Sequence, residues 1–168
     1  MKKILTTTAL ILALAFTAFS QQTIKLGHIN SAELMRAMPE LEEAEQRLQQ
    51  EVREAEAAYR TMMTELQNLA QEFQANQAQW SELIRTTRIR AIQDLEQRIQ
   101  DFEQQSQREL QFLQESLMAP IIERARRAIE DVARDNGFTY IFDTSGGMLL
   151  FAADSDDILP LVKRQMNL

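Results

Sequence analysis

Residues 40 to 119 read ELEEAEQRLQQEVREAEAAYRTMMTELQNLAQEFQANQAQWSELIRTTRIRAIQDLEQRIQDFEQQSQRELQFLQESLMA. This stretch contains no glycine or proline, and apolar residues recur through most of it with the period of an α-helix. A single helix over it would measure about 120 Å at ~1.5 Å per residue, and two arms would measure roughly 60 Å each. The stretch therefore predicts an elongated helical structure and not a compact catalytic pocket.

The first half of this stretch carries a heptad pattern. Its apolar residues alternate at steps of four and three, which keeps one narrow apolar seam on a helix and allows it to pair with another helix. Glutamate and glutamine dominate the surrounding positions, as is typical of a solvated helical surface. The seam residues are Leu48, Val52, Ala55, Tyr59, Met62, Leu66, Leu69, Phe73 and Trp80.

The second half continues the seam with one irregularity. Its apolar residues run from Ile92 to Ile121, but the polar Ser106 interrupts them. The step from 106 to 110 also breaks the heptad register, so we expect looser packing there.

A turn between the two halves is predicted near residues 76 to 81. The seam is lost in this segment, and Asn76 and Ser81 offer a helix end and a helix start. Equal arms on either side would pair as an antiparallel coiled coil, a helical hairpin over residues 39 to 119. One continuous helix is the alternative, because no glycine or proline marks the turn.

Most apolar side chains in the arms are interpreted as the core of this coiled coil. Some are displaced from the seam, and these would instead face a groove or cavity. Methionine suits such a surface because its flexible thioether adapts to irregular partners. The displaced residues are Met63, Ile84, Ile89 and Phe112.

Residues 1 to 20 have the features of a cleaved secretory signal. Lys2 and Lys3 precede an apolar run over residues 4 to 16, and small residues precede Gln21. The run is short and rich in threonine for a membrane span, although a retained anchor is the alternative. The mature product is expected to be exported and soluble.

The segments on either side of the long stretch change character. Residues 23 to 30 favour a β-strand, and Ser31 is a candidate N-cap for a helix ending at Met38. Pro120 is expected to begin a further helix, which Gly137 ends because glycine tolerates a left-handed conformation.

The C-terminal segment predicts a β-hairpin and a last helix. Residues 138 to 143 read as a strand, followed by a glycine turn and a partner strand over residues 148 to 152. Asp156 or Asp157 is expected to cap the last helix, with Pro160 in its first turn. Such a small body buries little apolar area, so oligomerisation would help to stabilise it.

Composition argues against several classes of function. The chain has 18 basic and 25 acidic residues and a net charge of −7, so it is a poor nucleic-acid binder. It has no cysteine, and its one histidine, His28, is interpreted as packed or at the surface. Residues 154 to 157 distantly resemble a calcium loop, but the required glycine and glutamate do not follow. We therefore expect no catalytic residues, no cofactor and no metal.

Three segments resemble the Skp/OmpH family of periplasmic chaperones of Gram-negative bacteria. They are TIKLGHINSAELMRAMPE from residue 23, PIIERARRAIEDVARDNGFTYIFD from residue 120 and DSDDILPLVKRQMNL from residue 154. The resemblance covers essentially the whole chain after residue 20, although the middle is generic coiled coil.

The resemblance implies an α+β, mostly helical, jellyfish-like homotrimer. Residues 21 to 38 and 120 to 168 would form a shared β-rich trimerisation body, and the three hairpins would surround a cavity. The function implied is an ATP-independent periplasmic holdase, which binds unfolded outer-membrane β-barrel proteins and prevents their aggregation. The strands of the body would contain Ile24, Leu26, Ile29, Tyr140, Phe142, Leu149 and Phe151.

The acidic charge departs from the family pattern, because its best-known members are strongly basic. Arg85, Arg88 and Arg90 follow the expected tip, and a second basic cluster spans residues 124 to 127. These arginines are interpreted as solvated helix-face charges, or alternatively as a basic tip for clients or transient membrane-surface contact. We therefore give more weight to enclosure and apolar contact than to electrostatic capture. A structural coiled-coil adaptor of the cell envelope is the rival function.

Overall fold

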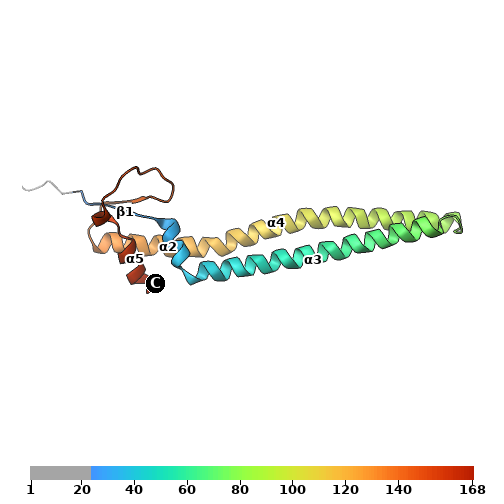
Figure 1. Ribbon diagram of the computed structural model, residues 1–168, viewed down its shortest axis with the longest axis horizontal. Coiled ribbons are helices and arrows are strands. Elements are labelled where there is room, and N and C mark those ends of the chain that lie inside the picture. The colour runs from blue at the N-terminus through green and yellow to red at the C-terminus, as the bar shows by residue number, and fades with distance from the viewer. Residues whose placement is uncertain (1–23) are drawn as a thin grey trace, which may run out of the picture. The chain divides into compact units, whose positions relative to one another are not determined.

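The computed structural model describes residues 24–168 (Figure 1), so the expected signal over residues 1 to 20 lies outside the described part. The described chain is mostly helical with one small strand pair, which confirms the coarse fold class. In chain order the elements are β1 (Leu26–Ile29), α2 (Ser31–Ala37), α3 (Pro39–Asn76), α4 (Glu82–Asp135), β2 (Tyr140–Asp143), the 3-10 helix η2 (Asp154–Asp156) and α5 (Leu159–Met166).

The chain divides into two compact units. One, called the strand unit below, comprises the segment ending at Ser31 together with Ile129–Asn167. The other, called the helical unit, is Ala32–Ala128 with Leu168. The division between body and hairpin at residues 38/39 and 119/120 stays a prediction.

Pro120 does not begin a new helix, which corrects the sequence expectation. It lies inside α4, which continues to Asp135. A proline within a helix removes one backbone hydrogen bond and strains the preceding turn. Here the helix continues because the residues after it are packed: Ile121 and Ala125 are 5% and 4% exposed.

In the helical unit α3 and α4 lie side by side and antiparallel (Figure 1). Ionic and hydrogen-bonded contacts join them at three levels: Glu40 with Arg124, Tyr59 with Glu103, and Glu72 with Arg88. Residue numbers rise along α3 as those of the partners fall along α4, so the two helices run in opposite directions. The alternative of one continuous helix is wrong.

The connection between the helices occupies residues 77 to 81, inside the segment where the sequence predicted a turn. The N–H of Gln79 donates to the carbonyl of Asn76 at 2.9 Å, which closes the turn. Ser81 then caps α4: its carbonyl accepts from the N–H of Arg85 at 3.0 Å, and its Oγ accepts from the N–H of Ile84 at 3.4 Å.

The apolar seam faces the partner helix. Every predicted seam residue of α3 is half-buried, whereas most of the residues between them are exposed. Leu95 and Ile99 of α4 are 2% and 6% exposed. The heptad pattern therefore located the contact surface of a coiled-coil-like helix pair.

In the strand unit β1 and β2 are parallel, with Leu26 opposite Tyr140 and Ile29 opposite Asp143. The pairing extends at both ends, because the N–H of Thr139 donates to the carbonyl of Lys25 and that of Thr144 to the carbonyl of Ile29. On the other edge of β1, the N–H of Ile158 donates to the carbonyl of His28 at 2.9 Å.

The expected β-hairpin is wrong for this chain, because β2 pairs with β1 and residues 148 to 152 form no strand. Ile24, Leu149 and Phe151 therefore lie outside its strands. The side chains of Leu150 and Phe151 are 97% and 86% exposed, so no burial stabilises a strand there.

The ends of the helices follow local chemistry. Gly137, with φ of 70°, follows the end of α4 as expected. The N-cap position of α5 is Ile158, so neither Asp156 nor Asp157 occupies it as predicted. Asp157, one residue earlier, still binds the first turn, because its Oδ1 accepts from the N–H of Leu159 at 2.9 Å. Ser31 is not an N-cap: it begins α2, and its Oγ donates to Asp143 at 2.5 Å.

No helix in the described residues has both the length and the apolar character that a membrane span requires.

Candidate functional site

The four apolar residues predicted to face a groove are all exposed. The exposed fractions are 39% for Met63, 44% for Ile84, 42% for Ile89 and 73% for Phe112. They do not form one cluster: Ile89 and Phe112 are separated by about 35 Å along α4, at ~1.5 Å per residue. Leu83, beside the turn, is 78% exposed and was not predicted from the sequence. Its position off the apolar seam could have identified it.

The predicted basic tip is partly neutralised. Arg85 forms an ion pair with Glu82 at 2.7 Å, and Arg88 forms one with Glu72 at 3.1 Å. The guanidinium of Arg88 also lies 5.6 Å from the ring centre of Trp80, while Arg90 is exposed. These contacts favour the interpretation of solvated helix-face charges for Arg85 and Arg88.

The second basic cluster is neutralised in the same way. Arg124 forms an ion pair with Glu40, and Arg126 and Arg127 both bind Glu123, at 2.8 Å and 2.9 Å. The hydrogen bonds from Arg126 and then Arg127 lower the pKa of Glu123 to about 2, so its carboxylate stays charged at neutral pH.

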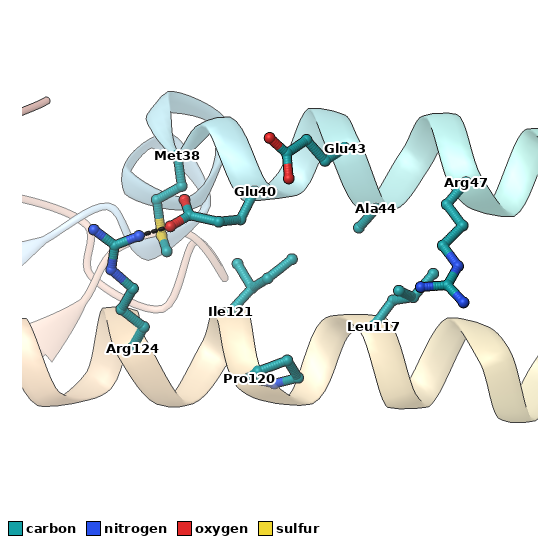
Figure 2. Close-up of a pocket in the computed structure, with 9 residues that line it drawn as sticks. All are labelled: Met38, Glu40, Glu43, Ala44, Arg47, Leu117, Pro120, Ile121 and Arg124. Carbon is teal, nitrogen blue, oxygen red and sulfur yellow. Dashed lines mark ion pairs between the residues drawn. The ribbon is translucent and has the colours of Figure 1, made fainter.

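A groove with a volume of about 390 Å³ lies at the end of the helix pair near Pro120, and Figure 2 shows the residues that line it. Leu117 and Ile121 of α4 point toward α3 from one side, and Ala44 faces them from the other. The Glu40–Arg124 ion pair lies at one end of this groove.

Two further grooves flank the contact at Ser106, where the sequence predicted loose packing. They share Ala55, Phe102, Ser106 and Leu110, and their volumes are about 540 Å³ and 580 Å³. Small side chains on both helices, together with the register break, leave this space unfilled. The first groove is completed by Glu51, Glu54, Ala58, Glu109 and Leu113, and the second by Glu56, Tyr59, Glu103, Gln104 and Gln107.

Tyr59 contacts Glu103 across the second groove. The hydrogen bond to the carboxylate of Glu103, followed by its negative charge, raises the pKa of Tyr59 above its ordinary value. The phenol therefore remains a neutral donor at physiological pH and joins α3 to α4 beside the register break.

The strand unit exposes a second apolar surface. Of the seven residues predicted for the trimer body, only Ile29 is buried, at 2% exposure. The side chains of the other six are at least 37% exposed. Two neighbouring apolar residues, Met148 and Leu150, are 90% and 97% exposed. Ile29 thus belongs to the core of its own chain. The other apolar residues remain exposed to solvent in a single chain.

Titratable groups in the strand unit are engaged in structural contacts. His28 Nε2 donates to the carbonyl of Ala153 at 3.1 Å. The ammonium of Lys25 lies 4.1 Å from the ring centre of Phe138 and donates to the carbonyl of Asn136 at 2.8 Å. Among residues 24–168 there is no group of three or more His, Cys, Asp or Glu side chains placed to hold a metal ion.

Comparison with known proteins finds a matching family model and solved structures of similar fold. A family model described as outer membrane protein (OmpH-like) matches residues 25–166. A crystal structure from Caulobacter crescentus CB15, described as a candidate OmpH-like outer membrane chaperone, superposes with a TM-score of 0.76 at 14% identity, covering 88% of this chain and 86% of that one. The second match shows a likeness of fold. Comparison with curated protein sequences finds no significant match.

Proposed function

Because this chain belongs to the family of OmpH-like outer membrane proteins, we propose that it is a periplasmic holdase chaperone. It binds unfolded outer-membrane β-barrel proteins, called clients below, and prevents their aggregation without ATP. The family match and the fold of the Caulobacter crescentus protein support the general chaperone role. The periplasmic location rests on the signal-like residues 1 to 20.

The observation that carries the proposal is the unequal exposure of apolar side chains. In the helical unit the seam is occupied by the α3–α4 contact, and the exposed apolar residues are few and spread out. Scattered apolar residues on a polar surface suit weak, sequence-tolerant binding of an unfolded chain, because no single site dominates.

A homotrimer is part of the same proposal. The exposed apolar surface of the strand unit would be covered by equivalent surfaces of two other copies. Oligomer formation buries such surface, and a small body needs the added burial. Three α3–α4 pairs would then surround the client.

Two measurements test this proposal. Light scattering is expected to give the mass of three chains, and the protein is expected to suppress aggregation of a urea-unfolded outer-membrane barrel protein after dilution. A monomer with no effect on aggregation would contradict both parts. Stable binding to one folded envelope protein, again with no effect on aggregation, would favour a structural adaptor instead.

A further inference from the structure

The two grooves beside Ser106 combine apolar floors with acidic rims. Phe102 and Leu110 contribute to the floors of both grooves. Glu51, Glu54 and Glu109 line the first groove, and Glu56 and Glu103 line the second. Among the described residues that line either groove, none is Lys or Arg. Glu56 of the second groove is nevertheless paired with Arg60 at 3.0 Å, so the first groove is the one whose described contacts include no cation.

Two carboxylates of the first groove are bound by glutamine amides and not by cations. Glu54 accepts a hydrogen bond from Gln50 at 2.9 Å, and Glu109 accepts one from Gln105 at 2.8 Å. A glutamine amide donates without neutralising its partner. The first groove therefore presents negative charge beside apolar surface, unlike the paired arginines near the turn.

An exposed aromatic ring lies outside the lining of this groove, close to it along α4. Phe112 lies three residues after Glu109, so both side chains lie on the same face of α4. Its ring is 73% exposed. An exposed aromatic side chain therefore lies beyond the acidic rim, on the face of α4 that carries Glu109.

We propose that the first groove binds extended polypeptide segments in which an apolar or aromatic side chain is flanked by Lys or Arg. The apolar side chain occupies the floor at the Ala55–Ser106 contact, and the flanking cations lie against the rim carboxylates. Segments flanked by Asp or Glu meet like charge at the rim and in the net charge of −7 of the whole chain. The inference rests on the proposed holdase function and specifies the chemistry of its clients.

The test uses three fluorescent peptides with the same aromatic centre and flanks of Lys, Gln or Glu. Binding to the full-length protein is measured by fluorescence anisotropy at low and at physiological salt. The Kd of the Lys-flanked peptide is expected to be roughly three- to tenfold lower than that of the Glu-flanked peptide, and the difference should shrink as salt screens the charges. Equal Kd values for the three peptides would overturn the inference.

Matched variants test whether the preference for the Lys-flanked peptide arises at the first groove. Replacing the rim carboxylates by Glu51→Gln, Glu54→Gln and Glu109→Gln together is expected to abolish the preference for the Lys-flanked peptide. The control removes the same number of charges elsewhere on the two helices, by Glu45→Gln, Asp94→Asn and Glu96→Gln, and should retain it. An equal loss in both variants would assign the preference to net charge and overturn the groove as its origin.

A second variant tests the floor. Ser106→Leu continues the apolar seam and fills the space between the helices, so it is expected to weaken binding of the Lys-flanked peptide several-fold while circular dichroism shows an unchanged helix content. Unchanged binding would overturn the assignment.

The inference and the proposed function fail separately. Intact suppression of aggregation with no peptide preference would overturn the inference alone. Loss of suppression with the preference retained would overturn the holdase function alone.

Discussion

Asp143 joins two segments that are far apart in sequence. Its Oδ1 accepts from the N–H of Ser31 at 3.2 Å and from that of Ser145 at 2.9 Å, and its Oδ2 accepts from the Ser31 hydroxyl at 2.5 Å. Burial alone would raise the pKa of Asp143, but these hydrogen bonds outweigh it and hold the pKa below its ordinary value of 3.8. The ionised carboxylate therefore stabilises the folded strand unit.

Asp143→Asn is expected to lower the free energy of unfolding by about 1 kcal/mol at pH 7, measured with urea at a fixed protein concentration. Because the folded pKa is depressed, this contribution is fully present above pH 3.8 and is lost as the pH falls through the lower folded value. The stabilities of parent and variant should converge under acidic conditions. A difference that persists unchanged at low pH would argue against a role for the charge.

Gly27 allows β1 to approach the residues around β2. A Cβ at this position would lie 2.8 Å from a ring carbon of Phe138 and 2.9 Å from the Cδ1 of Ile141. Gly27→Ala is therefore expected to lower the free energy of unfolding by about 1 to 3 kcal/mol. Gly146→Ala is the matched control, since nothing lies within 4 Å of its Cβ, and it should leave the denaturation midpoint nearly unchanged.

At the scale of elements, Pro120 locally destabilises α4, and packing of the residues after it keeps the helix continuous. Pro120→Ala restores a backbone donor within α4, so the free energy of unfolding should rise by about 1 to 3 kcal/mol in thermal or urea denaturation. Pro160→Ala serves as the control: this proline lies in the first turn of α5, where an N–H has no helical partner, and little change is expected. A similar gain at both positions would contradict the explanation.

The seam of the helix pair was predictable from sequence because the helical period is local. Spacings of three and four residues decide which side chains share a face, whatever the rest of the chain does. The same spacing located the irregularity at Ser106, beside which two grooves lie. The charges near the turn were harder to interpret, since the Glu72–Arg88 pair forms only when the helices fold together.

At the scale of the whole molecule, the exposed apolar residues of the strand unit are proposed to form the trimer interface. The double variant Leu150→Glu and Phe151→Glu introduces charge on side chains that are 97% and 86% exposed in a single chain. Its mass by light scattering is expected to fall from three chains to one, because burying these charges would cost several kcal/mol. Leu83→Glu, also at an exposed apolar residue but beside the turn, should retain the mass of the trimer.

The α3–α4 helix pairs are proposed to enclose the client. Deleting residues 62 to 75 of α3 together with residues 87 to 100 of α4 removes two matched heptads from each arm and keeps the turn. The shortened protein should remain a trimer but suppress aggregation of an unfolded barrel protein less well than the full-length chain. Unchanged suppression would show that the arms are not the binding element.

Local sequence patterns were sufficient to predict the helical stretches before and after Pro120, the paired faces of α3 and α4, the turn near residues 76 to 81 and the end of α4 just before Gly137. They did not predict that α4 continues through Pro120. They were insufficient for the partner of β2, which is β1 from the opposite end of the chain and not the adjacent residues 148 to 152. Helical periodicity and capping act over a few residues, so a sequence displays them directly. Strand pairing, ion pairs between helices and the burial of Ile29 depend on which distant segments meet, and only the folded chain determines that.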